Sequence, residues 1–130
     1  MLVKCKVLII DGGESTRTFM RFVLTNAGYR VSVAHTAAKA LEILADEMFD
    51  VILIDPRLPD MDGIDLIKEI RLIEAFKSCP ILGVSQPFNT TIQAQGKTAG
   101  VTNWINQPVS PHNLTETVKE IAPAPEVYDD

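Results

Sequence analysis

The chain has 130 residues, of which 46% are hydrophobic and 22% are charged, a composition that is ordinary for one soluble domain with a sizeable core. Its formal net charge of -5, from 12 basic and 17 acidic residues, argues against a nucleic-acid-binding surface. The two cysteines form no disulfide framework, and the apolar run after Lys6 ends at Asp11, too early for a signal peptide or a membrane span. A cytoplasmic protein is therefore expected.

Five short apolar runs predict the strands of a sheet. They lie at residues 7–10, 31–34, 51–54, 81–84 and, more weakly, 104–105. The run at 51–54 consists of four consecutive apolar residues between turn residues, which is typical of a strand that is buried on both faces of a parallel sheet.

Amphipathic segments between these runs predict five helices. The first carries Phe19, Phe22 and Val23 on one face. The segment 89–99 is the poorest helix because Gly96 and two threonines lower its helix propensity, so a short or mobile helix is expected there. The other three helices have apolar residues at three- and four-residue steps, namely Ala37, Leu41 and Leu44, then Leu66, Ile67, Ile70 and Ile73, and finally Leu114, Val118 and Ile121.

The alternation of strands and helices predicts βαβ units, and hence a parallel sheet that is covered by helices on both faces. Five such units give an α/β, (βα)5 doubly wound fold, for which the flavodoxin-like strand order 2-1-3-4-5 is the natural choice. One domain is expected over residues 1–122. The Pro-rich, acidic segment 123–130 is interpreted as a frayed tail or the start of a linker.

Three predicted strands end in polar side chains. Asp11 follows the first strand, Asp55 follows the third, and Ser85 follows the fourth. These strands are neighbours in the 2-1-3-4-5 order, so their side chains are expected to converge at the edge where such folds bind ligands. Two carboxylates and a hydroxyl there could hold a divalent cation and bind or accept a phosphoryl group. The alternative is that Asp11 and Asp55 only cap the turns after their strands.

Four segments of the chain together point to one family. They are KVLIIDGGES, VILIDPRLPDMDG, PILGVSQ and AGVTNWINQPVSPHNL. Over residues 6–121 the chain resembles the CheY-like receiver domain of two-component response regulators. The resemblance puts Asp55 at the phosphorylated aspartate and Ser85 at the switch hydroxyl. It also puts Trp104 at the switch aromatic residue and Gln107 at the position of the usual lysine.

The resemblance implies a role in phosphorelay signal transduction. A histidine kinase or a phosphotransfer protein would donate a phosphoryl group to Asp55, with Mg²⁺ as the cofactor. The aromatic residue would then rotate inward and reshape the face made by the fourth helix, fifth strand and fifth helix. An output domain, another partner protein or a second copy of the chain would bind that face. No enzyme activity is implied beyond self-phosphorylation at Asp55 from a kinase or a small phosphodonor.

The chain departs from the family's pattern at two positions. Gly12 stands where the family has the second of two adjacent acids, which is normally a direct metal ligand, and Gln107 replaces the lysine. The resemblance leaves Asp11, Asp55 and the backbone carbonyl of Arg57 as metal ligands, so Mg²⁺ is expected to bind weakly or not at all. Glutamine donates a hydrogen bond but no charge. Each lost contact commonly costs about 2–4 kcal/mol, so impaired phosphorylation is expected.

Two residues are candidates for compensation. Arg57 follows Asp55 by two residues, and its guanidinium could pair with Asp55 or Asp11 and replace part of the missing charge, or it could point into solvent. Glu14 could send a carboxylate back to the site, although a role at the N-terminus of the first helix is the simpler interpretation.

Three functions stay open on the sequence alone. The first is a receiver that accepts phosphate at Asp55 with altered kinetics. The second is a pseudo-receiver, a protein interaction module that acts independently of phosphorylation. The third is another flavodoxin-like catalyst with Asp55 as nucleophile, for which the sequence has no substrate-pocket motif. Asp11, Asp55, Ser85 and the aromatic Trp104 favour the first function, whereas Gly12 and Gln107 favour the second.

Overall fold

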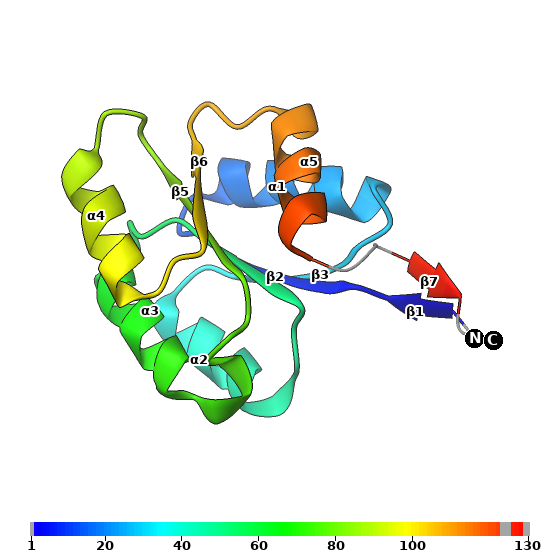
Figure 1. Ribbon diagram of the computed structural model, residues 1–130, viewed down its shortest axis with the longest axis horizontal. Coiled ribbons are helices and arrows are strands. Elements are labelled where there is room, and N and C mark those ends of the chain that lie inside the picture. The colour runs from blue at the N-terminus through cyan, green and yellow to red at the C-terminus, as the bar shows by residue number, and fades with distance from the viewer. Residues whose placement is uncertain (1, 123–125, 129–130) are drawn as a thin grey trace.

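Five parallel strands form the central sheet of the computed structural model, which describes residues 2–122 and 126–128. The order across the sheet is β3-β2-β4-β5-β6 (Figure 1). This is the predicted 2-1-3-4-5 order, because a short strand, β1, precedes the first strand of the sheet. The strands are β2 (Lys6–Ile10), β3 (Arg30–Ala34), β4 (Val51–Ile54), β5 (Ile81–Ser85) and β6 (Asn103–Asn106).

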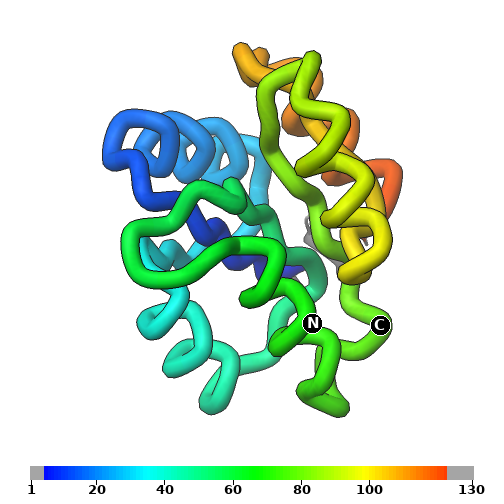
Figure 2. The backbone as a smooth tube through the Cα atoms, turned by 90° about the vertical axis from the view of Figure 1, so that its left-hand side faces the viewer, coloured from blue at the N-terminus to red at the C-terminus, as the bar shows by residue number. Residues whose placement is uncertain are grey.

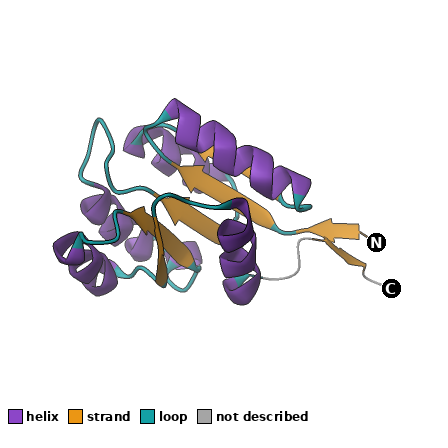
Figure 3. Cartoon of the chain, turned by 90° about the horizontal axis from the view of Figure 1, so that it is seen from above, coloured by secondary structure: helices purple, strands orange, loops and turns teal. Residues whose placement is uncertain are grey.

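Helices cover both faces of this sheet (Figures 1 and 3). One face carries α1 (Glu14–Asn26) and α5 (Pro111–Ile121), and the other carries α2 (Ala37–Asp46), α3 (Gly63–Leu72) and α4 (Thr90–Ala99). A short 3₁₀ helix, η1 (Glu74–Phe76), follows α3. Within the described residues, every helix is too short or too polar to cross a membrane.

The sheet divides the core into two apolar layers. In β4, Ile52 and Ile54 face α2, α3 and α4, whereas Val51 and Leu53 face α1 and α5. All four side chains are completely buried, so the prediction of a strand that is covered on both faces is confirmed. The sheet therefore holds β4 rigidly, and the residue that follows it, Asp55, starts from a fixed point at the carboxyl edge.

The three residues that were predicted to share a face of α1 lie together, but they are not the residues that the helix buries. Met20 and Leu24 are the buried residues of this helix, whereas Phe22 is 69% exposed and Phe19 is 36% exposed. The sheet contacts the helix through the Met20 and Leu24 pair, one turn apart. Phe19, Phe22 and Val23 line the groove between α1 and α5 instead.

The helix α4 has ten residues, like α2 and α3, so the expectation of a short helix is wrong. The Asn89 side chain accepts a hydrogen bond from the backbone N–H of Ile92 at 3.2 Å, which caps the helix. Tertiary packing against Gly96 offsets the low helix propensity of the segment. The mobility of α4 stays a prediction.

The C-terminal segment is paired where a frayed tail or linker was expected. Strand β7 (Glu126–Tyr128) runs antiparallel to β1 (Leu2–Lys4), with Leu2 opposite Tyr128. This ribbon extends from the end of the sheet that lies opposite the carboxyl edge (Figures 1 and 3). Residues 126–128 are therefore paired rather than frayed, the start of a linker stays a prediction, and residues 123–125 and 129–130 lie outside the described residues. The domain limit at residue 122 stays a prediction.

Candidate functional site

The three polar side chains that were predicted to converge do lie at one edge of the sheet. Figure 2 looks onto this carboxyl edge, where β2, β4 and β5 end side by side. Asp11 is 3% exposed, and Asp55 and Ser85 are each 4% exposed. Within the described part of the chain, these three are the buried polar or charged residues. Buried polar groups require partners, so the contacts of each one indicate what the site can do.

Asp55 is held by Arg57 in a two-pronged ion pair. Arg57 Nη2 donates to Asp55 Oδ2 at 2.7 Å, and Arg57 Nε donates to Oδ1 at 3.1 Å. The backbone N–H of Arg57 also donates to Oδ1 at 3.0 Å. Hydrogen bonding to Asp55 raises the pKa of Arg57. Of the alternatives that the sequence leaves open, Arg57 thus pairs with Asp55, not with Asp11 and not with solvent alone.

Gln107 extends this ion pair toward β5. Its Oε1 accepts a hydrogen bond from Arg57 Nη2 at 3.3 Å and another from Gln86 Nε2 at 2.9 Å. The residue at the lysine position therefore acts here as an acceptor for Arg57. It adds no positive charge beside Asp55.

Asp11 has one satisfied and one unsatisfied carboxylate oxygen. Its Oδ1 accepts the backbone N–H of Gly13 at 2.7 Å, whereas its Oδ2 is buried without a hydrogen-bond partner. Burial raises the pKa of Asp11, and the Gly13 hydrogen bond opposes that shift. Arg17 donates only to the backbone oxygen of Asp11, at 2.9 Å. Glu14 is exposed in the first turn of α1, which agrees with its simpler interpretation.

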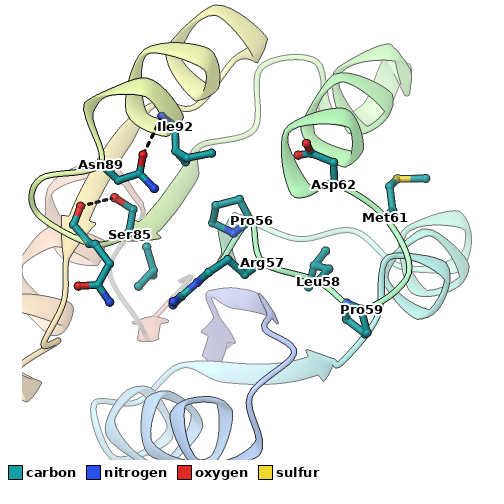
Figure 4. Close-up of a pocket in the computed structure, with 11 residues that line it drawn as sticks. Pro56, Arg57, Leu58, Pro59, Met61, Asp62, Ser85, Asn89 and Ile92 are labelled. Carbon is teal, nitrogen blue, oxygen red and sulfur yellow. Dashed lines mark hydrogen bonds between the residues drawn. The ribbon is translucent and has the colours of Figure 1, made fainter.

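The Ser85 hydroxyl is engaged as both donor and acceptor. It donates to the backbone oxygen of Gln86 at 3.0 Å and accepts from Gln93 Nε2, also at 3.0 Å. The first of these bonds is visible at the wall of a cleft of about 480 Å³ between the β4–α3 and β5–α4 loops (Figure 4). Arg57 also borders this cleft, so the Arg57 end of the ion pair is accessible from solvent while Asp55 stays buried.

Trp104 is packed inward against α4. A Cβ atom added at Gly83 of β5 or at Gly96 of α4 would overlap the indole ring, so the two glycines form a slot that the ring fills. The indole N–H donates to the backbone oxygen of Gln93 at 3.2 Å. Sequence reasoning missed Gln93 and the slot, although a glycine inside a strand can signal a close approach of this kind.

The fold and site geometry agree with a known family. The family model of the response regulator receiver domain matches residues 7–119. The chain belongs to this family. Receiver domains are generally non-enzymatic signalling modules that interact with histidine kinases, phosphotransfer proteins and output domains.

Relatives of this receiver domain differ widely in length. The sensor histidine kinase CheAY of Helicobacter pylori is 33% identical over 115 residues, which make up 87% of this chain and 14% of the kinase. A 14.6 kDa protein of Leptolyngbya boryana is 27% identical over 92% of this chain and 91% of its own length. The chain spans 14% to 16% of the length of the first curated relatives that it matches.

Solved receiver structures superpose closely on this receiver domain. The chemotaxis response regulator CheY4 of Vibrio cholerae has a TM-score of 0.87 and 31% identity, covering 92% of this chain and 99% of its own. The receiver domain of the sensor histidine kinase PA1611 of Pseudomonas aeruginosa has a TM-score of 0.84 and 23% identity, covering 92% and 98%. The PA1611 structure contains a magnesium ion in its active-site cleft.

Receiver domains commonly bind Mg²⁺, but the residues of this site do not fit a resident ion as they are arranged. Asp11 Oδ2 is a free hard oxygen, yet the Asp55 oxygens are bonded to Arg57, and Gly12 has no ligand atom. Among residues 2–122 and 126–128, no group of three His, Cys, Asp or Glu side chains is placed to hold a metal. A cation would have to displace the Arg57 guanidinium to reach Asp55.

Proposed function

We propose that the chain is a phosphorelay receiver domain whose phosphoacceptor is Asp55 and whose phosphorylation is impaired. The observation that carries this proposal is the two-pronged ion pair between Asp55 and Arg57. Asp55 is buried after the central strand β4, beside Ser85 at the end of the neighbouring strand β5. Its carboxylate is thus fixed in position but is neutralised in the resting protein by a residue of its own loop.

In the proposed reaction, an Asp55 oxygen attacks the phosphorus of a phosphohistidine and forms an acyl phosphate. The bond between phosphorus and nitrogen breaks, and the imidazole keeps its electron pair and then takes a proton. Arg57 must first release the attacking oxygen. Losing such a charged hydrogen bond costs about 1.5–3 kcal/mol, which slows the reaction roughly 10- to 150-fold. The Arg57 side chain is 62% exposed, so it has room to leave.

Weak magnesium binding is part of the same proposal. A cation at Asp11, Asp55 and the Arg57 carbonyl would bring charge to the acyl phosphate, but it would compete with the Arg57 guanidinium. Gln107 supplies no charge to replace it. The phosphodonor would be a histidine kinase, a phosphotransfer protein or a small phosphodonor, and the location would be the cytoplasm. An output domain, another protein or a second copy would bind the face of α4, β6 and α5.

The intact mass of the protein tests this proposal. Wild-type protein is incubated with Mg²⁺ and acetyl phosphate, beside Asp55→Asn and beside an ordinary receiver domain. We expect a phosphoryl adduct on the wild type and none on Asp55→Asn. The adduct on the wild type should form more slowly than the adduct on the ordinary receiver domain. An adduct on Asp55→Asn, or wild-type kinetics equal to those of the ordinary receiver, would contradict it.

A pseudo-receiver is the second candidate function. It is favoured by the Asp55 carboxylate, which is bonded to Arg57, and by Trp104, which is already packed inward without a phosphoryl group. In that case the protein would show no adduct over times that saturate the ordinary receiver. Its partner would then bind wild type and Asp55→Asn equally well.

A further inference from the structure

Gln93 contacts both the Ser85 hydroxyl and Trp104. It lies in the first turn of α4, and its side-chain Nε2 donates to Ser85 Oγ at 3.0 Å. The same nitrogen lies 3.3 Å from the Gln86 backbone oxygen and 3.3 Å from Asn106 Oδ1. Its backbone oxygen accepts the indole N–H of Trp104 at 3.2 Å. One residue of α4 thus joins the end of β5 to the ring on β6.

The glycine slot makes the position of the indole depend on α4. Gly96 comes less than one turn after Gln93 in the same helix, and the Trp104 ring fills the space between it and Gly83. Glycine inside a helix costs about 1 kcal/mol relative to alanine, and the close fit of the ring offsets that cost. A displacement of α4 therefore changes both the packing of the indole and its hydrogen bond to Gln93.

The Ser85 hydroxyl has no free donor in the resting site. Its proton goes to the Gln86 backbone oxygen, and its lone pair receives the Gln93 amide. A phosphoryl group on Asp55 would be a charged acceptor, which forms shorter and stronger hydrogen bonds than a backbone carbonyl does. The hydroxyl would turn toward the phosphoryl oxygens, and the geometry of its bond from Gln93 would change.

We infer that Gln93 is a positioning residue that links the Ser85 hydroxyl to Trp104 through the first turn of α4. The link would carry a change at the phosphorylated site to Trp104, so its role in signalling rests on the proposed function of Asp55. The link itself is present in the resting protein, because every contact in it exists without a phosphoryl group.

A cycle of substitutions tests the link without phosphorylation. Trp104 is the only tryptophan, so tryptophan fluorescence and its quenching by acrylamide measure how well the indole is packed between Gly83 and Gly96. We expect Ser85→Ala to change the quenching constant at least twofold in the wild type and in the control Gln95→Leu, a matched amide on the exposed side of α4. In Gln93→Leu, the same Ser85→Ala change should have no effect. Equal effects in all three backgrounds, or none in any, would overturn the inference.

Gln93→Glu repeats the test with a side chain of the same shape that cannot donate when ionised, in case Gln93→Leu does not fold. A second measurement uses acetyl phosphate with Mg²⁺ and reads intact mass and Trp104 fluorescence together. We expect Gln93→Glu to form the wild-type amount of adduct while Trp104 fluorescence stays constant. A wild-type fluorescence response in this variant would overturn the inference. If the wild type forms no adduct, the proposed function fails. The Ser85→Ala cycle still shows whether Gln93 links Ser85 to Trp104, because it needs no phosphorylation.

Discussion

On the β2 and β4 side of the carboxyl edge the site is built from charges, whereas on the β5 and β6 side it is built from neutral groups. Asp11, Asp55 and Arg57 make up the first side. On the second side, a hydroxyl and four amide side chains join through hydrogen bonds, and between Ser78 and Thr115 the only Lys, Arg, Asp or Glu is Lys97.

The two kinds of bonding differ in how much it costs to change them. A charge-assisted, two-pronged pair is roughly twice as strong per bond as a neutral one, and breaking it leaves a buried carboxylate without its counter-charge. Neutral hydrogen bonds contribute only about 1 kcal/mol each and exchange partners readily. Under the proposed function, the charged side would therefore resist the arrival of a phosphoryl group, and the neutral side would respond to it.

Placing charges on both sides should produce the largest effect. The double variant Gly12→Asp with Gln107→Lys should accelerate Mg²⁺-dependent phosphorylation by acetyl phosphate at least about 100-fold, since each contact is worth about 2–4 kcal/mol. A Cβ atom at Gly12 would lie 3.3 Å from both the Arg57 oxygen and Pro59 Cδ, so the acid fits after a small shift. Intact mass over time measures the rate, with each single variant as a control. An unchanged rate would show that the missing charges are not what impairs the site.

The glycine slot on the neutral side can be broken directly. Gly83→Ala should lower the free energy of unfolding by about 1–3 kcal/mol, because its methyl group would overlap the Trp104 ring. Urea unfolding measures the loss. In a Trp104→Ala background the same change should cost less than about 0.5 kcal/mol. An equal cost in both backgrounds would place the strain elsewhere.

Removing the guanidinium tests the charged side. Arg57→Ala should raise the affinity for Mg²⁺ about 10-fold, because a cation no longer has to displace a charged hydrogen-bond donor from Asp55. Isothermal titration calorimetry measures the affinity. The gain should disappear in Arg57→Ala with Asp55→Asn. If Arg57→Ala leaves the affinity for Mg²⁺ unchanged, Arg57 does not compete for the site.

The smallest expected effect concerns the unpartnered oxygen of Asp11. Burial raises the pKa of Asp11, so the folded protein binds this proton more tightly than the unfolded chain does. The stability that Asp11 contributes is therefore complete below its ordinary pKa and is lost as the pH rises through the raised value. Asp11→Asn should increase the free energy of unfolding at pH 7 by about 1 kcal/mol, and the gain should shrink toward about pH 4. Urea unfolding at both pH values checks this, and a gain independent of pH would contradict it.

Most of the fold follows from local sequence signals. The apolar runs located the five strands, and the order of the strands brought Asp11, Asp55 and Ser85 to one edge, as the structure shows. The same signals do not fix how a helix is rotated on its axis. For this reason the face with Phe19, Phe22 and Val23 was singled out in α1, although Met20 and Leu24 are the residues that the helix buries.

Local sequence signals did not predict contacts between residues that are far apart in the chain. The strands β1 and β7 have three residues each, and their local sequences do not indicate that they pair with each other. The sequence left Arg57 to pair with Asp55, to pair with Asp11 or to point into solvent, because the choice depends on loop geometry. Gln93 carries no charge and lies within a helix, so only the folded arrangement brings it to Ser85.

The ribbon of β1 and β7 has a practical consequence for building with this domain. Leu2 and Tyr128 are paired, at the end of the molecule opposite the carboxyl edge (Figure 1). Circular permutation and insertion into a host loop both require adjacent ends that lie away from the functional surface. Leu2 and Tyr128 therefore offer two neighbouring points at which the receiver domain can be joined to a host protein, with its carboxyl edge facing away from the junction.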